Sequence, residues 1–253
     1  MAAGRRSRLV VHHSLVARLS VAAELSDAER DLIIRDTSAS VRRKAGVVVS
    51  EEGSPNNWVH AVLDGVACRY KQLSDGRRQI TSFILPGDFC DWRTPALRWT
   101  DHGILTLTPC TMIALDPTTI ERWSKYPALR HALSWAGLVE EAILREWIVN
   151  LGARDAVTRT GHLFCEIFSR LTIVGLSRPD GFDARLTQEV LAQALGLSLV
   201  HMNRSMKRLR DLGLMTFREG RVEIHELDKL KAVSDFDPAY LHLQGLRRPV
   251  HSV

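Results

Sequence analysis

The fold is decided by the stretch Leu186-Thr187-Gln188-Glu189-Val190-Leu191-Ala192-Gln193-Ala194-Leu195-Gly196-Leu197-Ser198. A threonine precedes a short apolar run and a glycine ends it, so we expect a two-turn helix capped at Thr187 and stopped at Gly196. Ser198 then stands where a second helix needs its N-cap. Two short helices joined by a glycine-containing turn form a helix-turn-helix unit.

The second helix of this unit is predicted to be basic on its exposed face. Met202, Met206 and Leu209 recur at i, i+4 and i+7, the spacing of a buried face. The residues expected to point outward are Val200, His201, Arg204, Ser205 and Arg208. From Ser198 to Arg210 there are four basic residues and no acidic one. A solvated basic helix without a partner has this pattern, and so does a helix that lies against the phosphates of double-stranded DNA.

The residues after this helix favour DNA. Residues 214–217 and 221–224 have strand character, and Arg218-Glu219-Gly220 between them is typical of a tight turn. A hairpin in this place is a wing, with Arg218 and Arg221 beside its tip. Helix, glycine turn, capped basic helix and hairpin, in that order, predict a C-terminal winged helix-turn-helix.

The N-terminal half is expected to form an antiparallel roll. Helical spacing over residues 15–38, with Ser26 as a cap, predicts one or two short helices. Short β-branched runs follow at residues 47–49, 58–63, 66–70, 79–85 and 105–115. Turn signals such as Asp64-Gly65 and Pro86-Gly87-Asp88 separate them. Strands at this spacing predict a β-roll of the jelly-roll or double-stranded β-helix kind.

A long helix is predicted to join the two halves. Between Pro127 and Asp155 a seam follows a 4,3,4,3,4,3 spacing: Leu129, Leu133, Ala136, Glu140, Ile143, Trp147 and Asn150. A helix of about 27 residues extends about 40 Å, more than a compact domain needs. The helix either packs only on its own roll or also pairs with its twin, and we predict that the seam forms a homodimer interface.

Composition narrows the function classes. The chain has 253 residues, with 34 Lys+Arg against 29 Asp+Glu, which permits a polyanionic partner. It lacks an apolar run of the roughly 18 residues that a membrane helix needs, and its basic N-terminus does not resemble a secretion signal. We therefore expect a cytoplasmic protein without a membrane partner.

The cysteine pattern and the missing catalytic motifs point away from metal chemistry and catalysis. The four cysteines, Cys68, Cys90, Cys110 and Cys165, form no Cys-x-x-Cys pair, so we expect core residues and no metal site. Residues 120–253 contain no Gly-rich phosphate loop, Gly-x-Ser-x-Gly elbow or His-Glu-x-x-His motif. We therefore expect that the protein is not an enzyme. One competing class is an enzyme or signalling protein that uses the roll as a regulatory module, and the other is a protein-interaction module without sequence-specific DNA binding.

The chain resembles the Crp/Fnr family of bacterial transcription regulators. The resemblance is strongest at Leu195-Gly196-Leu197-Ser198, His201-Met202-Asn203-Arg204 and Leu209-Arg210, which are similar to the family's recognition-helix signature. It extends to the turns of a cyclic-nucleotide-binding-like roll. The resemblance implies an α+β protein with an arm, short helices and a sensor roll over 1–125, a dimerisation helix over 126–155, a winged helix-turn-helix over 156–240 and a tail over 241–253.

The resemblance also implies a homodimer on palindromic double-stranded DNA, with RNA polymerase as a further partner. The family's three base-reading positions fall on Leu199, Val200 and Arg204, of which only Arg204 keeps the usual residue type. The complete expected DNA-binding set is Thr187, Gln188, Ser198, Leu199, Val200, His201, Asn203, Arg204, Lys207, Arg208, Arg218 and Arg221.

No cofactor is predicted, and the sequence indicates no particular effector. Relatives that respond to cyclic nucleotides carry a Gly-Glu pair and an Arg-Ser pair, whose positions fall here on Asp91-Trp92 and near Asp101-His102. Acids oppose the binding of an anion, so we expect no dependence on cyclic AMP. The alternatives are a member that responds to a cyclic nucleotide and a haem-responsive member, which would use His60, Cys68 or His102. No cysteine cluster precedes Cys68 to hold an iron–sulfur centre.

Overall fold

The computed structural model describes residues 13–55, 57–91 and 97–243. Two short helices open it, α1 (Ser14–Leu19) and α2 (Asp27–Asp36). The Ser26 Oγ accepts from the Glu29 N–H at 3.3 Å while the Glu29 carboxylate accepts from the Ser26 N–H at 2.9 Å. This reciprocal capping box begins α2 where the sequence predicts it.

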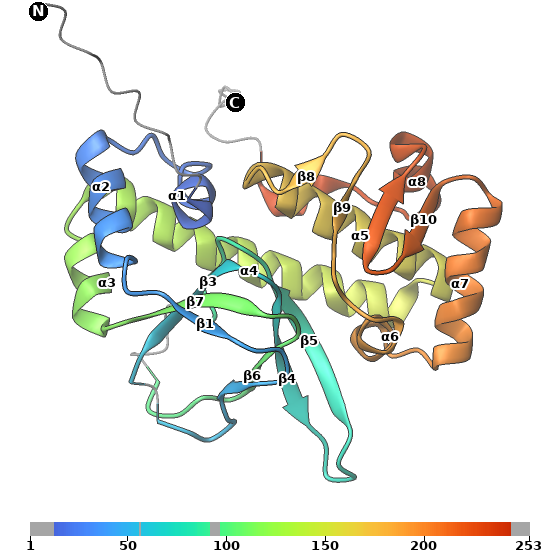
Figure 1. Ribbon diagram of the computed structural model, residues 1–253, viewed down its shortest axis with the longest axis horizontal. Coiled ribbons are helices and arrows are strands. Elements are labelled where there is room, and N and C mark those ends of the chain that lie inside the picture. Colours follow the sequence, from blue (N-terminus) through green and yellow to red (C-terminus); the bar gives the residue numbers. More distant parts are fainter. Residues whose placement is uncertain (1–12, 56, 92–96, 244–253) are drawn as a thin grey trace, which may run out of the picture.

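Two antiparallel sheets face each other and form the roll (Figure 1). The first has the order β1 (Val41–Arg43), β7 (Cys110–Leu115), β3 (Val59–Asp64). The second has the order β2 (Val48–Ser50), β6 (Gly103–Thr106), β4 (Ala67–Gln72), β5 (Arg78–Ile84). Buried apolar side chains from both sheets, including Val62, Ile84 and Met112, form a core between them. The expected β-roll is therefore present.

The strands differ from the sequence prediction in two places. Residues 105–115, expected as one strand, belong to β6 and β7 with a break at Pro109, which has no N–H to donate to a ladder. The break packs against a turn at Gly65, where a Cβ would lie 2.3 Å from the Pro109 carbonyl oxygen. The sequence analysis also missed β1, a short strand whose exposed side chains carry no apolar pattern.

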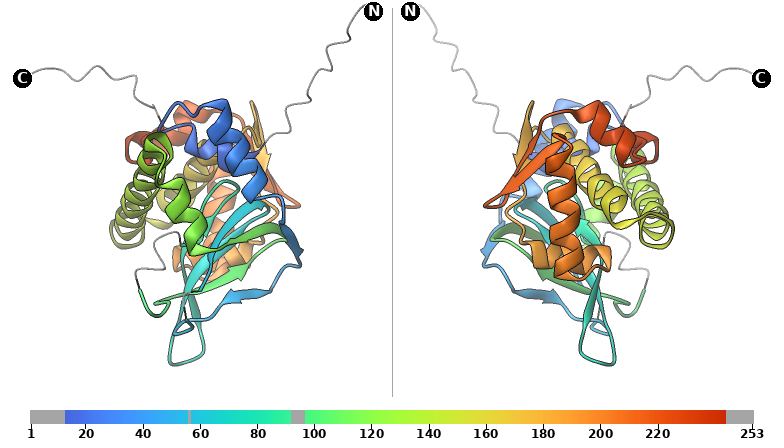
Figure 2. Two further views of the ribbon diagram at one scale, coloured as in Figure 1. Left: turned by 90° about the vertical axis from the view of Figure 1, so that its left-hand side faces the viewer. Right: turned by 90° about the vertical axis from the view of Figure 1, so that its right-hand side faces the viewer.

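A long helix lies along the roll. After α3 (Pro117–Trp123), α4 runs over Pro127–Ala153, close to the predicted range (Figure 1). Its buried face contacts the roll and the C-terminal half. In both views of Figure 2 this green to yellow-green helix lies at one side of the molecule. It thus connects all parts of the chain.

The C-terminal half is a helical unit with its own sheet. It contains α5 (Ala156–Ile173), β8 (Ser177–Arg178), β9 (Gly181–Asp183), α6 (Gln188–Leu195), α7 (Leu199–Asp211), β10 (Met215–Arg218), β11 (Arg221–Ile224), α8 (Leu227–Val233) and the 3-10 helix η2 (Pro238–Leu241). The strand β9 forms because it pairs with β11, and this pairing buries Phe182 under the wing.

Candidate nucleic-acid interface

The helix-turn-helix forms through the caps that the sequence predicts. The Thr187 Oγ1 accepts from the Val190 N–H at 3.3 Å and begins α6. Gly196 ends α6 in the left-handed region at φ +60°, and the Ser198 Oγ accepts from the His201 N–H at 3.3 Å to begin α7. These contacts fix the angle between the two helices.

One face of α7 packs into the protein. Met202 and Leu209 are fully buried, and Met206 is half-buried. Ser205, expected to point outward, is buried as well, because it lies between Met202 and Leu209 on the face that contacts α5. A small polar residue in this place carries no apolar signal from which its burial could be predicted.

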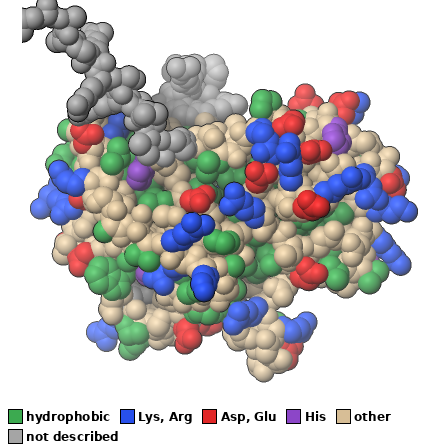
Figure 3. All heavy atoms as spheres, viewed as in Figure 1, with side chains coloured by type: hydrophobic (Ala, Val, Ile, Leu, Met, Phe, Trp, Pro, Cys, Tyr) green, Lys and Arg blue, Asp and Glu red, His purple; other side chains and the backbone are tan. Residues whose placement is uncertain are grey.

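The other face of α7 is exposed. Its surface residues include His201, Asn203, Arg204, Lys207 and Arg208. Leu199 and Val200 are 42% and 59% exposed, so they add apolar surface to this face. Lys and Arg side chains gather along the edge of the molecule where α7 lies (Figure 3). This face can dock into a groove of a duplex.

A hollow of about 260 Å³ lies between α6, α7 and the wing. Its lining includes Gln188, Asn203, Lys207, Arg210 and Arg218, and no carboxylate of the described residues belongs to it. Three cations around one concave surface suit a backbone phosphate. Arg210 is not in the predicted DNA-binding set, although its place on the exposed face of the helix could have indicated it.

The wing is a tight hairpin. Glu219 and Gly220 both have positive φ, +51° and +77°, as a two-residue type I′ turn requires. Arg218 lines the hollow, whereas Arg221 lies 3.2 Å from a Glu223 carboxylate oxygen and 3.7 Å from one of Asp180. Arg218 is therefore better placed than Arg221 to meet a phosphate.

The predicted dimer seam on α4 faces the chain's own interior. Leu129, Leu133, Ile143, Trp147 and Asn150 are buried within a single chain, and Ala136 and Glu140 are half-buried. Ile143 and Trp147 belong to the core shared with α5, so a second chain cannot reach them. Burial thus argues against a dimer role for the five buried residues, whereas the assignment of Ala136 and Glu140 stays a prediction.

A different face of α4 is open. Leu138 and Ile148 are 61% and 71% exposed, and Leu144 and Val149 are also exposed. Glu141 and Arg145 lie among them and approach each other to 3.9 Å. An apolar stripe with a charged pair on one exposed helix face is typical of a helix-pairing surface.

The space between the roll and α4 is taken up by Arg69. Its Nε donates to the Cys90 carbonyl at 2.8 Å, one Nη donates to the Phe89 carbonyl at 3.0 Å, and the guanidinium pairs with Glu140. A cavity of only about 30 Å³ remains beside this pair. Glu140, from the predicted seam, thus ties α4 to the roll.

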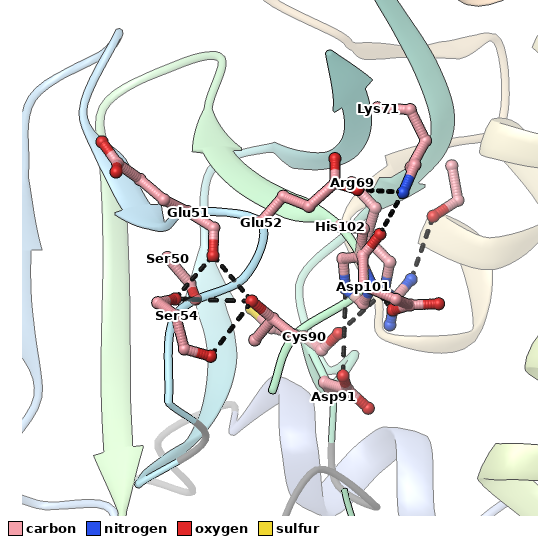
Figure 4. A network of polar contacts seen from close by, with 12 residues as sticks. Ser50, Glu51, Glu52, Ser54, Arg69, Lys71, Cys90, Asp91, Asp101 and His102 are labelled. Carbon is pink, nitrogen blue, oxygen red and sulfur yellow. Dashed lines mark hydrogen bonds and ion pairs between the residues drawn. The ribbon is translucent and has the colours of Figure 1, made fainter. Parts of the chain in front are cut away.

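The residues expected to decide nucleotide binding lie around a polar pocket in the roll (Figure 4). The pocket has a volume of about 300 Å³, and Glu51, His60 and Asp91 line it. Asp101 hydrogen-bonds His102 at 2.6 Å, which lowers the pKa of that carboxyl, while burial lowers the pKa of His60. Trp92 lies outside the described residues. Two acids in the lining disfavour the binding of a phosphate there.

The cysteines lie in the core. All four thiols are free and buried, and burial raises the pKa of Cys68 and of Cys165 to about 12. Among the described residues, no three His, Cys, Asp or Glu side chains come together as a metal site needs. No helix in the described part of the chain is long and apolar enough to cross a bilayer.

A buried ionic cluster joins the two halves, which sequence reasoning did not foresee. Arg170 of α5 donates to Asp88 of the roll at 2.6 Å and to Glu166 at 2.8 Å. Arg18 of α1 lies 3.3 Å from the other Asp88 oxygen. Burial alone would raise the pKa of Asp88, but Arg170 and Arg18 outweigh it and lower that pKa. Charges far apart in the sequence therefore fix one arrangement of the halves.

Two family models match this chain. A cyclic nucleotide-binding domain matches residues 40–125, and a Crp-like helix-turn-helix domain matches residues 158–233. Together they cover the roll and the unit that contains α6, α7 and the wing.

Known regulators and a solved structure are similar to it. The transcriptional activator protein FnrL of Cereibacter sphaeroides is 29% identical over 182 residues, 70% of this chain and 72% of that protein. The nitrogen fixation regulation protein FixK of Bradyrhizobium diazoefficiens is 26% identical over 232 residues, 90% and 93% of the two chains. The structure of FixK2 from Bradyrhizobium japonicum matches with a TM-score of 0.68 at 20% identity, over 77% of this chain and 96% of that one.

Proposed function

Because this chain belongs to the Crp/Fnr family of transcription regulators, we propose that α7 reads a palindromic operator while a second copy reads the other half-site. Members of this family are DNA-binding regulators and not enzymes. The observation that carries the proposal is the exposed face of α7, which has no acid from Leu199 to Arg210, beside the basic hollow.

The exposed side chains of α7 divide into two roles. Arg204 can donate two hydrogen bonds to guanine O6 and N7 in the major groove. Leu199 and Val200 can only contact thymine methyl groups, and His201 and Asn203 lie beside them. Arg204 therefore supplies most of the hydrogen-bonded base recognition.

A second group of side chains holds the phosphates. Lys207, Arg208, Arg210 and Arg218 supply cations, and Gln188 lines the same hollow. Thr187 and Ser198 act chiefly as caps that aim the helices, since their hydroxyl oxygens accept from backbone N–H groups. This group sets affinity and register without reading sequence.

The dimer forms through the open face of α4. Leu138, Leu144 and Ile148 would pack against the same residues of a two-fold related copy. Glu141 of one chain can then approach Arg145 of the other. This face replaces the seam that the spacing alone suggested.

The protein acts without cyclic AMP. Glu51 and Asp91 line the pocket in the roll, and the Arg69–Glu140 pair fills the space beside α4.

RNA polymerase is a further partner of this protein, as for an activator of this family.

The salt dependence of DNA binding tests the proposal. Binding of a random-sequence duplex, measured by fluorescence anisotropy, should weaken steeply with salt, with a log–log slope of about −4 or steeper if four or more cations meet phosphates. A protein that binds no duplex at low salt would be a signalling module of another kind.

A further inference from the structure

We propose that a groove between the two halves of the chain binds a small amphipathic carboxylate. This junction groove has a volume of about 670 Å³, and its lining includes Trp135, Phe168, Leu227, Lys231, Pro238 and Leu243. That volume lies within the range of about 300 to 1,000 Å³ typical of small-molecule sites. It is larger than the pocket in the roll.

Both halves of the chain build the junction groove. Val21 and Ala22, just after α1, and Trp135 of α4 form one wall. Phe168 of α5 and residues of α8 and η2 form the opposite wall. Figure 1 shows α1 toward the left and α8 toward the right, both above α4. A molecule bound here touches the sensor half and the DNA-binding half at once.

The floor of the junction groove is apolar and partly aromatic. Trp135 and Phe168 are half-buried and leave ring surface toward the groove. Leu227, Pro238 and Leu243 add aliphatic surface. Such walls favour a ligand with an aromatic or alkyl body, which gains free energy by leaving water.

The rim supplies a cation for the polar end of the ligand. Lys231 has only a loose partner, a carboxylate oxygen of the fully exposed Asp228 at 3.9 Å, so its ammonium can turn to an anion at little cost. The one carboxylate in the lining, Asp237, caps η2 by accepting from the Ala239 N–H at 2.9 Å. His131 and His242 add hydrogen-bonding rings. This set matches a carboxylate better than a cation.

Trp135 links the junction groove to the buried ionic cluster. The Arg18 guanidinium lies 4.8 Å from the centre of the Trp135 ring, and Arg18 pairs with Asp88. A ligand against Trp135 therefore contacts the joint between the halves and can change the affinity of the protein for DNA. This regulatory effect rests on the proposed function. By linkage, the DNA-bound form must then bind the ligand with a different affinity.

Calorimetry with naphthoate and its uncharged analogue naphthamide tests the site on the full chain without DNA. Naphthoate should bind one molecule per chain, and Lys231→Ala should weaken it by about three- to fivefold, the size of a partly exposed ion pair. The same variant should leave naphthamide binding unchanged, since only the charged ligand loses a partner. Lys229→Ala, in the same helix but outside the groove, is the matched control.

A steric variant gives a second test. Ala239→Trp should fill the groove and abolish naphthoate binding while the far-ultraviolet spectrum stays that of the parent. Naphthoate that does not bind, or that binds all variants equally, overturns the proposal. DNA affinity is then measured with and without naphthoate. A protein that binds naphthoate but binds no DNA, with or without that ligand, would refute the proposed function alone.

Discussion

Of the three side chains at the family's base-reading positions, Leu199, Val200 and Arg204, only Arg204 can donate a pair of hydrogen bonds. Arg204→Ala should therefore lower affinity for the preferred operator by about 1–3 kcal/mol, or about 5- to 150-fold, and lower affinity for a random duplex far less. Anisotropy titrations on both duplexes measure this difference. Arg208→Ala should weaken both duplexes and reduce the salt slope by about one unit. Equal losses on both duplexes for Arg204→Ala would remove it from base reading.

His162 provides a residue-scale prediction about acid stability. It is buried beside Phe236, and burial lowers its pKa to about 3, although its Nε2 lies 3.2 Å from a Glu146 oxygen. The unfolded chain binds this proton near pH 6.5, so the folded state loses stability as the pH falls from about 6.5 toward 3.

His162→Gln should make that loss shallower by up to about 1.4 kcal/mol per pH unit. Denaturant unfolding of both proteins across this pH range measures the difference. Groups such as Asp88, whose pKa is lowered in both proteins, cancel in the comparison. Parallel stability curves would show that His162 does not titrate on unfolding.

At the scale of elements, α4 carries the dimer prediction. Ile148→Glu places a charge on the open face and should give monomers by light scattering at micromolar concentration. Ile34→Glu, at another exposed isoleucine, on α2, should leave the dimer intact. A dimeric Ile148→Glu protein would exclude this face.

The variant that the sequence alone suggests behaves differently. Ile143 is 5% exposed, so Ile143→Glu buries a charge in the core and should unfold the protein instead of only separating the copies. Helical spacing at Leu129, Ile143 and Trp147 predicted a buried face, and the face is buried. Spacing does not indicate whether the covering surface belongs to the same chain or to another, and this is why the seam was misassigned.

Other elements were predictable where local chemistry decides them. The caps at Thr187, Gly196 and Ser198 act within four residues, so α6 and α7 could be predicted from sequence. The strand β9 could not, because Gly181–Asp183 becomes a strand only by pairing with β11, about forty residues later. The hollow could not be predicted either, because Arg210 of α7 and Arg218 of β10 come together only in the folded chain.

At the scale of the whole molecule, Arg170 holds the halves together. Arg170→Met removes the cation that Asp88 and Glu166 share and leaves two buried carboxylates, so we expect a loss of about 3–5 kcal/mol in unfolding free energy. Denaturant melts followed by tryptophan fluorescence measure it. Arg178→Met, which breaks exposed pairs with Asp180 and Asp183, should leave the unfolding free energy nearly unchanged. Equal losses for the two variants would show that the cluster does not hold the joint.

The central claim is that a dimer reads a palindrome through two copies of α7, and selection of duplexes from a random pool tests it most directly. The purified full chain is incubated with the pool without added ligand, and the bound duplexes are sequenced. We predict a palindromic consensus with half-sites about one helical turn apart and guanine in each half-site. A pool that stays unenriched, or a consensus without two-fold symmetry, would contradict the account.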